Sequence, residues 1–224
     1  MFPLRDTQKS YSTPVVTIIL IVINLLVFLY EFSLDDYSRN AFIAQYGLIP
    51  DRFAWSSVLT SMFLHGGWMH VLGNMWFLWI FGDNIEDILG HGKFIAFYLL
   101  CGIAAALAQS WINSYSRVPM VGASGAIAGV MGAYMVKFPR ARILTLVPII
   151  VFFTTFEVPA WVMLIYWFVL QLFGGVGSIA QTQGSQEIGG TAFFAHVGGF
   201  VAGIILIHVL GARQAYTRRR DIYW

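Results

Sequence analysis

Charge is scarce in this chain. Only 13 Lys and Arg and 11 Asp and Glu occur among its 224 residues, or 11%, whereas soluble domains average about 25%. Hydrophobic residues make up 58% of the chain, and the mean hydropathy is +0.71. This composition excludes a disordered chain, a coiled coil and an ordinary cytosolic enzyme, and it favours a membrane protein that crosses the bilayer several times.

Cysteine and net charge are low as well. The single cysteine, Cys101, excludes an internal disulfide and a cysteine-based metal cluster. A net charge of +2 is too small to indicate a nucleic-acid partner. We therefore expect the lipid bilayer as the surroundings, with no nucleic acid, metal or cofactor bound.

Runs without charge are long enough to cross a membrane. A bilayer core needs about 20 helical residues, and six such runs occur, at residues 14–30, 58–82, 94–113, 118–136, 158–180 and 188–212. A seventh run, 143–156, is short and contains Pro148, so we interpret it as an interfacial or loop segment. Residues 174–190 are rich in Gly, Ser and Gln, which predicts a mobile external loop.

The distribution of positive charge orients these runs. With six spans and a cytoplasmic N-terminus, ten of the 13 Lys and Arg lie inside and three outside. A seventh span at 143–156 would change this to six inside and seven outside. The positive-inside bias therefore predicts one all-α domain over 1–224, with six transmembrane helices and short cytoplasmic tails at about 1–13 and 213–224.

Four polar residues fall at a common depth in spans two, four and six. At 1.5 Å per helical residue, Ser124 and His70 lie about 20 Å from the cytoplasmic end, Asn74 about 14 Å and His196 about 26 Å. Polar side chains inside a span are functional candidates. Glycines around Ser124 and after His196 would let spans four and six approach closely.

This set of residues suits hydrolysis. Ser124 can be the nucleophile and His196 the base, while Asn74 and His70, four residues apart on one helix face, can donate hydrogen bonds to an oxyanion. Acidic residues are missing from the depth of every run, which favours a Ser-His dyad over a triad and argues against an aspartyl protease. The metalloprotease motif His-Glu-x-x-His is missing too.

The ordered motifs resemble those of the rhomboid intramembrane serine proteases over nearly the whole chain. They are His65-x4-His70-x3-Asn74, Glu86-x3-Gly90, Gly122-Ala123-Ser124-Gly125 and Ala195-His196-x2-Gly199-x3-Gly203.

The resemblance implies a six-helix fold whose active site opens to the outside through a water-filled cavity. It implies Ser124 and His196 as the catalytic dyad, with His70 and Asn74 as oxyanion partners. The loop before span six would be a cap and span five a lateral gate. The resemblance also implies structural roles for a further set: His65, Gly122, Gly125, Gly199 and Glu86.

Two departures from the family pattern stand out. Some members place a Tyr four residues after the nucleophile, against the catalytic His, and here that residue is Ala128, so other packing must hold His196. Some also carry a Trp-Arg pair in the first outer loop, where this chain has Ser56 and Ser57.

These features predict an intramembrane serine endopeptidase that cleaves single-span membrane proteins near the outer end of their helix. Two alternatives stay open: a non-catalytic rhomboid-like binder of transmembrane helices, and a small transporter or haem-binding membrane protein that uses His70 and His196. Ser124 would then be a packing residue, and His70 and Asn74 would brace helices. A bacterial-type plasma membrane is the expected location.

Overall fold

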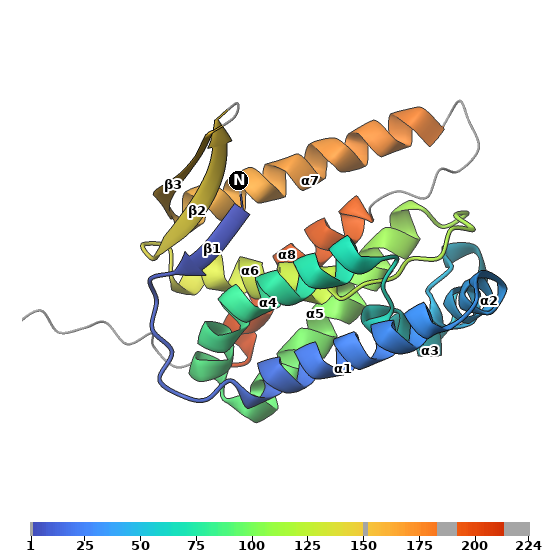
Figure 1. Cartoon of the computed structure of the whole chain (residues 1–224), viewed down its shortest axis with the longest axis horizontal. Helices are drawn as coiled ribbons and strands as arrows, with labels where there is room; N and C mark the ends of the chain where they lie inside the picture. The colour runs from blue at the N-terminus through green and yellow to red at the C-terminus, as the bar shows by residue number, and fades with distance from the viewer. Residues whose placement is uncertain (1, 150–151, 183–191, 213–224) are drawn as a thin grey trace, which may run out of the picture.

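Helices dominate the chain, which is described here by a computed structural model covering residues 2–149, 152–182 and 192–212 (Figure 1). Short 3-10 turns at Pro50–Arg52 and Ser61–Phe63 flank α3. The α-helices of the described residues are α1 (Val15–Ser33), α2 (Asp36–Tyr46), α3 (Trp55–Thr60), α4 (Trp68–Leu89), α5 (His91–Ile112), α6 (Ser124–Lys137), α7 (Ala160–Thr182) and α8 (Phe193–Val209).

Each of the six predicted spans overlaps at least one α-helix, with corrected boundaries. The run at 58–82 includes the end of α3, and its long helix, α4, starts only at Trp68 after two consecutive glycines. The run at 118–136 becomes helical only at Ser124. By length and composition, α1 and α5 are the helices among the described residues that could cross a membrane, while α8 and the Ala160–Gly174 part of α7 are shorter apolar helices. The count of six spans stays a prediction.

The described residues of the segment 143–156, which are 143–149 and 152–156, form strands. They lie within an antiparallel hairpin of β2 (Arg142–Ile149) and β3 (Phe152–Pro159), with Leu146 opposite Thr155. Pro148 disfavours a helix, and the aromatic and β-branched residues around it favour strands. The all-α prediction is therefore wrong for this small three-stranded sheet.

The predicted N-terminal tail supplies the third strand, β1 (Phe2–Asp6), which pairs with β2 so that the strand order is β1-β2-β3. The Trp76 indole of α4 donates a hydrogen bond of 2.6 Å to the Pro3 carbonyl, and the Tyr134 hydroxyl donates to the Asp6 carboxylate. These contacts dock β1 on α4 and α6 (Figure 1). The predicted tail at 213–224 lies outside the described residues.

Helix α6 is the buried centre of the bundle, and α8 lies directly against it. A Cβ atom on Gly203 would overlap the backbone of Gly129, and one on Gly199 would overlap the carbonyl of Gly125. The two helix backbones are therefore in contact, which confirms the close approach expected from the glycine spacing.

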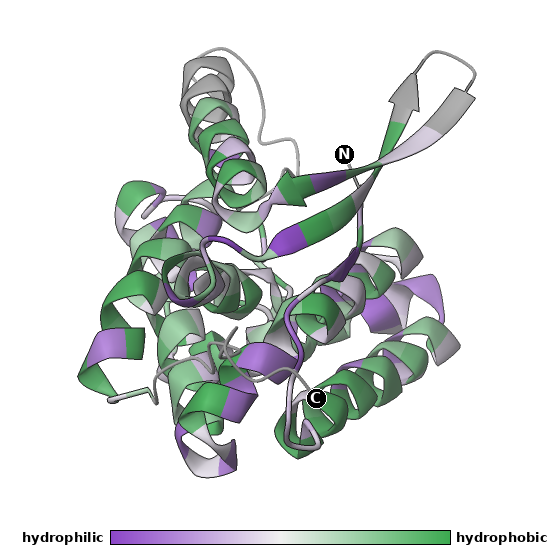
Figure 2. Cartoon of the chain, turned by 90° about the vertical axis from the view of Figure 1, so that its left-hand side faces the viewer, coloured by the Kyte–Doolittle hydropathy of each residue, from purple (hydrophilic) through white to green (hydrophobic). Residues whose placement is uncertain are grey.

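Hydrophobic residues predominate along the helices (Figure 2). Large exposed side chains include Leu26 of α1, Leu100 of α5 and Phe173 of α7. Such faces suit contact with lipid acyl chains, because lipid is as apolar as these side chains.

Helix α7 continues to Thr182, which corrects the predicted loop at 174–190. Residues 183–191 lie outside the described residues.

Candidate active site

Ser124 and His196 meet at the starts of their helices. Ser124 is the first residue of α6, and His196 lies in the first turn of α8. The glycine contacts between the two helices place Ser124 Oγ 2.7 Å from His196 Nε2, which is a hydrogen bond. The pair is shielded, since His196 is only 8% exposed. A serine hydroxyl bonded to an imidazole nitrogen is the geometry that general-base activation of a nucleophile requires.

The backbone just before Ser124 runs against His70 and Asn74. Gly122 has a φ of +124°, and a Cβ atom there would lie 2.8 Å from His70 Nε2 and 3.6 Å from Asn74 Nδ2. Only glycine therefore fits at this position, both for its backbone conformation and for the space available.

His70 and Asn74 both offer hydrogen-bond donors at this point. His70 Nδ1 accepts a hydrogen bond from the Gly66 N–H at 3.4 Å, so the proton of a neutral ring lies on Nε2, the atom nearest Gly122. Asn74 Nδ2 is buried and has no hydrogen-bond partner among the described residues. The N–H groups in the first turn of α6 add further donors, because they lack intrahelical partners. These groups can stabilise a negative charge that develops beside Ser124.

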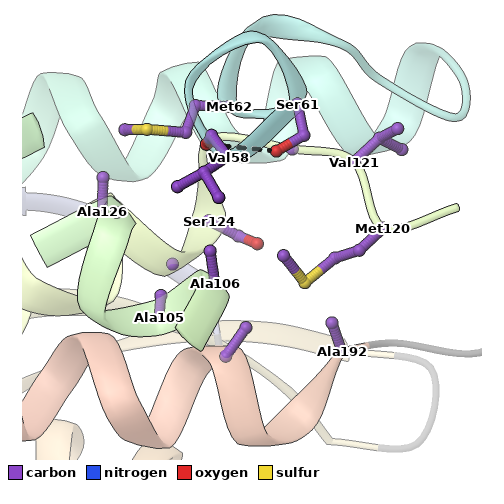
Figure 3. Close-up of a pocket in the computed structure, with 14 residues that line it drawn as sticks. Val58, Ser61, Met62, Ala105, Ala106, Met120, Val121, Ser124, Ala126 and Ala192 are labelled. Carbon is purple, nitrogen blue, oxygen red and sulfur yellow. Dashed lines mark hydrogen bonds between the residues drawn. The ribbon is translucent and has the colours of Figure 1, made fainter. Parts of the chain in front are cut away.

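A small cavity of about 20 Å³ lies beside Ser124. Figure 3 shows the Ser124 hydroxyl pointing into it. The volume suits one water molecule or a methyl-sized group. Its walls are mostly apolar and include Val58, Met62, Ala105, Ala106, Met120 and Ala126.

Of the residues with expected structural roles, His65 lies next to His70. Its ring centroid is 5.1 Å from that of His70, in an edge-on arrangement, and the His65 N–H donates to Glu31 at 3.2 Å. Gly125 and Gly199 belong to the contact between α6 and α8 described above.

Glu86 is not near this site. It lies 12 residues after Asn74 on α4, about 18 Å along the helix. Its carboxylate accepts hydrogen bonds of 2.8 Å from the N–H groups of Val16 and Thr17, and His91 Nδ1 lies 2.6 Å away. Glu86 therefore holds the start of α1, at a distance from Ser124.

Sequence reasoning missed two residues of α7 that contact His196. Gln171 Oε1 lies 2.7 Å from His196 Nδ1, and the Trp167 ring centroid is 5.7 Å from that of His196. Gln171 is a polar residue within an apolar run, which was the available signal. Trp167 packs on His196, whereas Ala128 of α6 is too small to do so.

No three His, Cys, Asp or Glu side chains converge as a metal site within residues 2–149, 152–182 and 192–212. The sequence predicted neither a cofactor nor a metal, and this stays a prediction.

Comparison with known proteins identifies the class. The rhomboid domain matches residues 52–213, and the chain belongs to the rhomboid family of integral membrane proteins. The mitochondrial Rhomboid protein 1 of Saccharomyces cerevisiae is 31% identical over 172 residues, which cover 73% of this chain and 45% of that protein.

Two further relatives extend the comparison. Rhomboid protease GluP of Bacillus subtilis is 32% identical over 139 residues, covering 58% of this chain and 27% of the relative. RHOMBOID-like protein 5 of Arabidopsis thaliana is 28% identical over 169 residues, covering 75% and 48%. The chain thus spans less than half the length of these three relatives.

Proposed function

We propose that this chain is an intramembrane serine endopeptidase that works with a Ser124-His196 dyad. The observation that carries the proposal is the 2.7 Å hydrogen bond between Ser124 Oγ and His196 Nε2, beside a group of buried donors. A helix-binding protein without catalytic activity would not need a nucleophile, a base and free donors at one point.

The proposed reaction follows from these positions. Ser124 Oγ attacks the substrate carbonyl carbon while its proton moves to His196 Nε2. The resulting oxyanion is stabilised by Asn74 Nδ2, His70 Nε2 and backbone N–H groups. His196 then gives the proton to the leaving amine, and the C–N bond breaks. Water activated by His196 finally hydrolyses the acyl-enzyme, which regenerates the Ser124 hydroxyl.

The proposed topology has six spans, formed by α1, α4, α5, α6, α7 and α8, with both termini in the cytoplasm. This topology keeps most of the positive charge inside, as the positive-inside rule requires. The first turn of α6, and with it Ser124, then lies toward the outer surface. We propose a bacterial-type plasma membrane as the location; the compared relatives include a protein of Bacillus subtilis and a mitochondrial protein.

The proposed substrates are single-span membrane proteins. A peptide bond within a helix is shielded from attack, so the substrate must unwind locally. The cavity beside Ser124, at about 20 Å³, favours a small side chain next to the cleaved bond. We therefore expect cleavage after residues such as Ala rather than after large aromatic residues.

Cleavage of a model transmembrane substrate in detergent tests the proposal. Wild type should cut and Ser124→Ala should lose cleavage by at least a thousandfold, because the nucleophile is gone. Ser33→Ala is the matched control, since Ser33 is exposed and its hydroxyl bonds only the Tyr30 carbonyl at 2.7 Å. Labelling with a fluorophosphonate provides a readout that needs no substrate.

Full cleavage by Ser124→Ala would overturn the proposal. A wild type that neither cuts a panel of transmembrane segments nor reacts with the fluorophosphonate would also overturn it, and it would favour the helix-binding function.

A further inference from the structure

Helix α7 directs two side chains at the ring of His196. Trp167 and Gln171 are four residues apart and therefore share one face of the helix. Gln171 Oε1 lies 2.7 Å from Nδ1, the ring nitrogen that does not face Ser124. The Trp167 ring lies at 5.7 Å between centroids and is tilted by 38° to the imidazole.

Gln171 occupies a position where packing alone would favour an apolar residue. The inward face of α7 contains Ala160, Met163 and Leu164, all of them buried, and it continues through Trp167 to Gln171. The outward face carries exposed apolar residues such as Val169 and Phe173. A polar side chain on the inward face of a membrane helix is unfavourable unless it finds a partner, and the partner of Gln171 is His196.

The ring nitrogen of His196 that carries the proton decides whether the dyad can react. A neutral imidazole carries one N–H, on either Nδ1 or Nε2. His196 Nε2 must accept the Ser124 proton, so the productive tautomer has its proton on Nδ1. An acceptor at Nδ1 favours that tautomer, whereas a donor there would favour the unproductive one.

We propose that Gln171 is a positioning residue that holds His196 in the productive tautomer, with Trp167 fixing the plane of the ring. This inference rests on the proposed function. The Gln171 side-chain carbonyl accepts the Nδ1–H of His196, as the carboxylate of a serine-protease triad does, but without its charge. The dyad thus has a neutral third member, supplied by a different helix from the two that carry Ser124 and His196.

Replacement of Gln171 by Met tests the role, because Met has a similar length and shape but only a weak thioether acceptor. We expect kcat to fall about tenfold to a hundredfold with KM nearly unchanged, since general-base catalysis contributes about a hundredfold or more. Gln171→Glu keeps an acceptor oxygen and should restore most of the rate. Leu170→Met is the matched control, because Leu170 is half exposed and belongs to the same stretch of α7.

The tautomer can be measured without any cleavage. Nitrogen-15 NMR of histidine-labelled protein, with the His196 signals assigned from a His196→Gln variant, should show the wild-type proton on Nδ1. Gln171→Met should move a substantial share of it to Nε2, while Gln171→Glu and Leu170→Met should leave it on Nδ1.

A wild-type proton on Nε2 would overturn the inference, and so would a Gln171→Met variant with unchanged tautomer and kcat. The tautomer readout still decides the role of Gln171 if Ser124→Ala retains cleavage, so failure of the inference and failure of the proposed function are distinguishable.

Discussion

Two polar side chains of helix α4, Asn74 near its start and Glu86 near its end, are hydrogen-bonded to very different degrees. Near its start, Asn74 Nδ2 and both ring nitrogens of neighbouring His65 are buried without hydrogen-bond partners among the described residues. Near its end, the Glu86 carboxylate accepts hydrogen bonds from the backbone of Val16 and Thr17 and from the Thr17 hydroxyl.

The difference between Asn74 and Glu86 indicates a role in the reaction for the first and a role in stability for the second. A buried polar atom without a partner lowers stability by about 1–3 kcal/mol. A reaction can supply the missing partner, and an oxyanion beside Ser124 would be one for Asn74. A fully bonded carboxylate has no capacity left for a ligand, so Glu86 contributes by holding α1 on α4. Substitutions at the two ends should therefore change different observables.

The largest effect is expected at the start of α4. Asn74→Ala removes a donor that has no partner in the resting protein, so the thermal midpoint should change little. Loss of one oxyanion donor should lower kcat about a hundredfold. Cleavage kinetics and thermal unfolding of the same preparation measure both quantities.

Asn84→Ala is the control toward the other end of the same helix. The Asn84 amide donates to neighbouring Asp83 at 2.7 Å, and its buried Oδ1 has no partner among the described residues, but it lies far from Ser124. Its kcat should match that of wild type. If Asn74→Ala instead unfolded at a much lower temperature and kept its kcat, Asn74 would be a bracing residue.

The next largest effect is expected at Glu86. Glu86→Gln turns one acceptor oxygen into a donor that faces the N–H groups of α1. Loss of charge-assisted hydrogen bonds should destabilise the protein by about 2 kcal/mol. Thermal unfolding should show the loss, while kcat per active molecule, counted by fluorophosphonate titration, should stay within twofold of wild type. A large fall in kcat would contradict the separation of the two ends.

The smallest effect is expected for β1, which lies against α4 and α6. Burial, with a further contribution from the charge of Asp83, raises the pKa of Asp6 from 3.8 to about 6, against the opposing effect of its hydrogen bond with Tyr134. The folded state therefore binds the proton more tightly than the unfolded chain. The stabilisation is complete below pH 4 and is lost as the pH rises toward 6.

The loss should be about 1 kcal/mol, because part of Asp6 is exposed to solvent. Thermal unfolding of wild type between pH 4 and pH 7 measures it. Asp6→Asn cannot ionise, so it should show a flatter profile over the same range. A wild type that became more stable from pH 4 to pH 6, relative to Asp6→Asn, would contradict the assigned shift.

Several elements could be predicted from the sequence because their signals are local. The apolar runs predicted where the long helices lie, and the spacing from Gly125 to Gly129 and from Gly199 to Gly203 predicted the close contact of α6 and α8. The hairpin of β2 and β3 could not be predicted in this way, because a short apolar run does not distinguish a strand from a helix or an interfacial segment. The pairing of β1 with β2 depends on residues more than 130 positions apart.

The residues of the candidate site also differ in whether a local signal in the sequence reveals them. Ser124, His196, His70 and Asn74 were found because a polar residue in an apolar span stands out. Gln171 is equally polar, but it lies on a helix without a recognised motif, and only the packing of α7 shows that it reaches His196. Glu86 was found too, but only the fold shows that its carboxylate accepts hydrogen bonds from the start of α1.

The sequence by itself determined that this is a membrane protein of largely helical structure and that its polar residues of interest lie at similar depths, because hydropathy and helical rise are properties of each segment alone. Only the tertiary structure decided which nitrogen of His196 faces Ser124, which residue holds the other nitrogen and which polar atoms are left without partners. These features depend on contacts between segments that are distant in the chain, and a hydrogen bond requires atoms to lie within about 3 Å of each other.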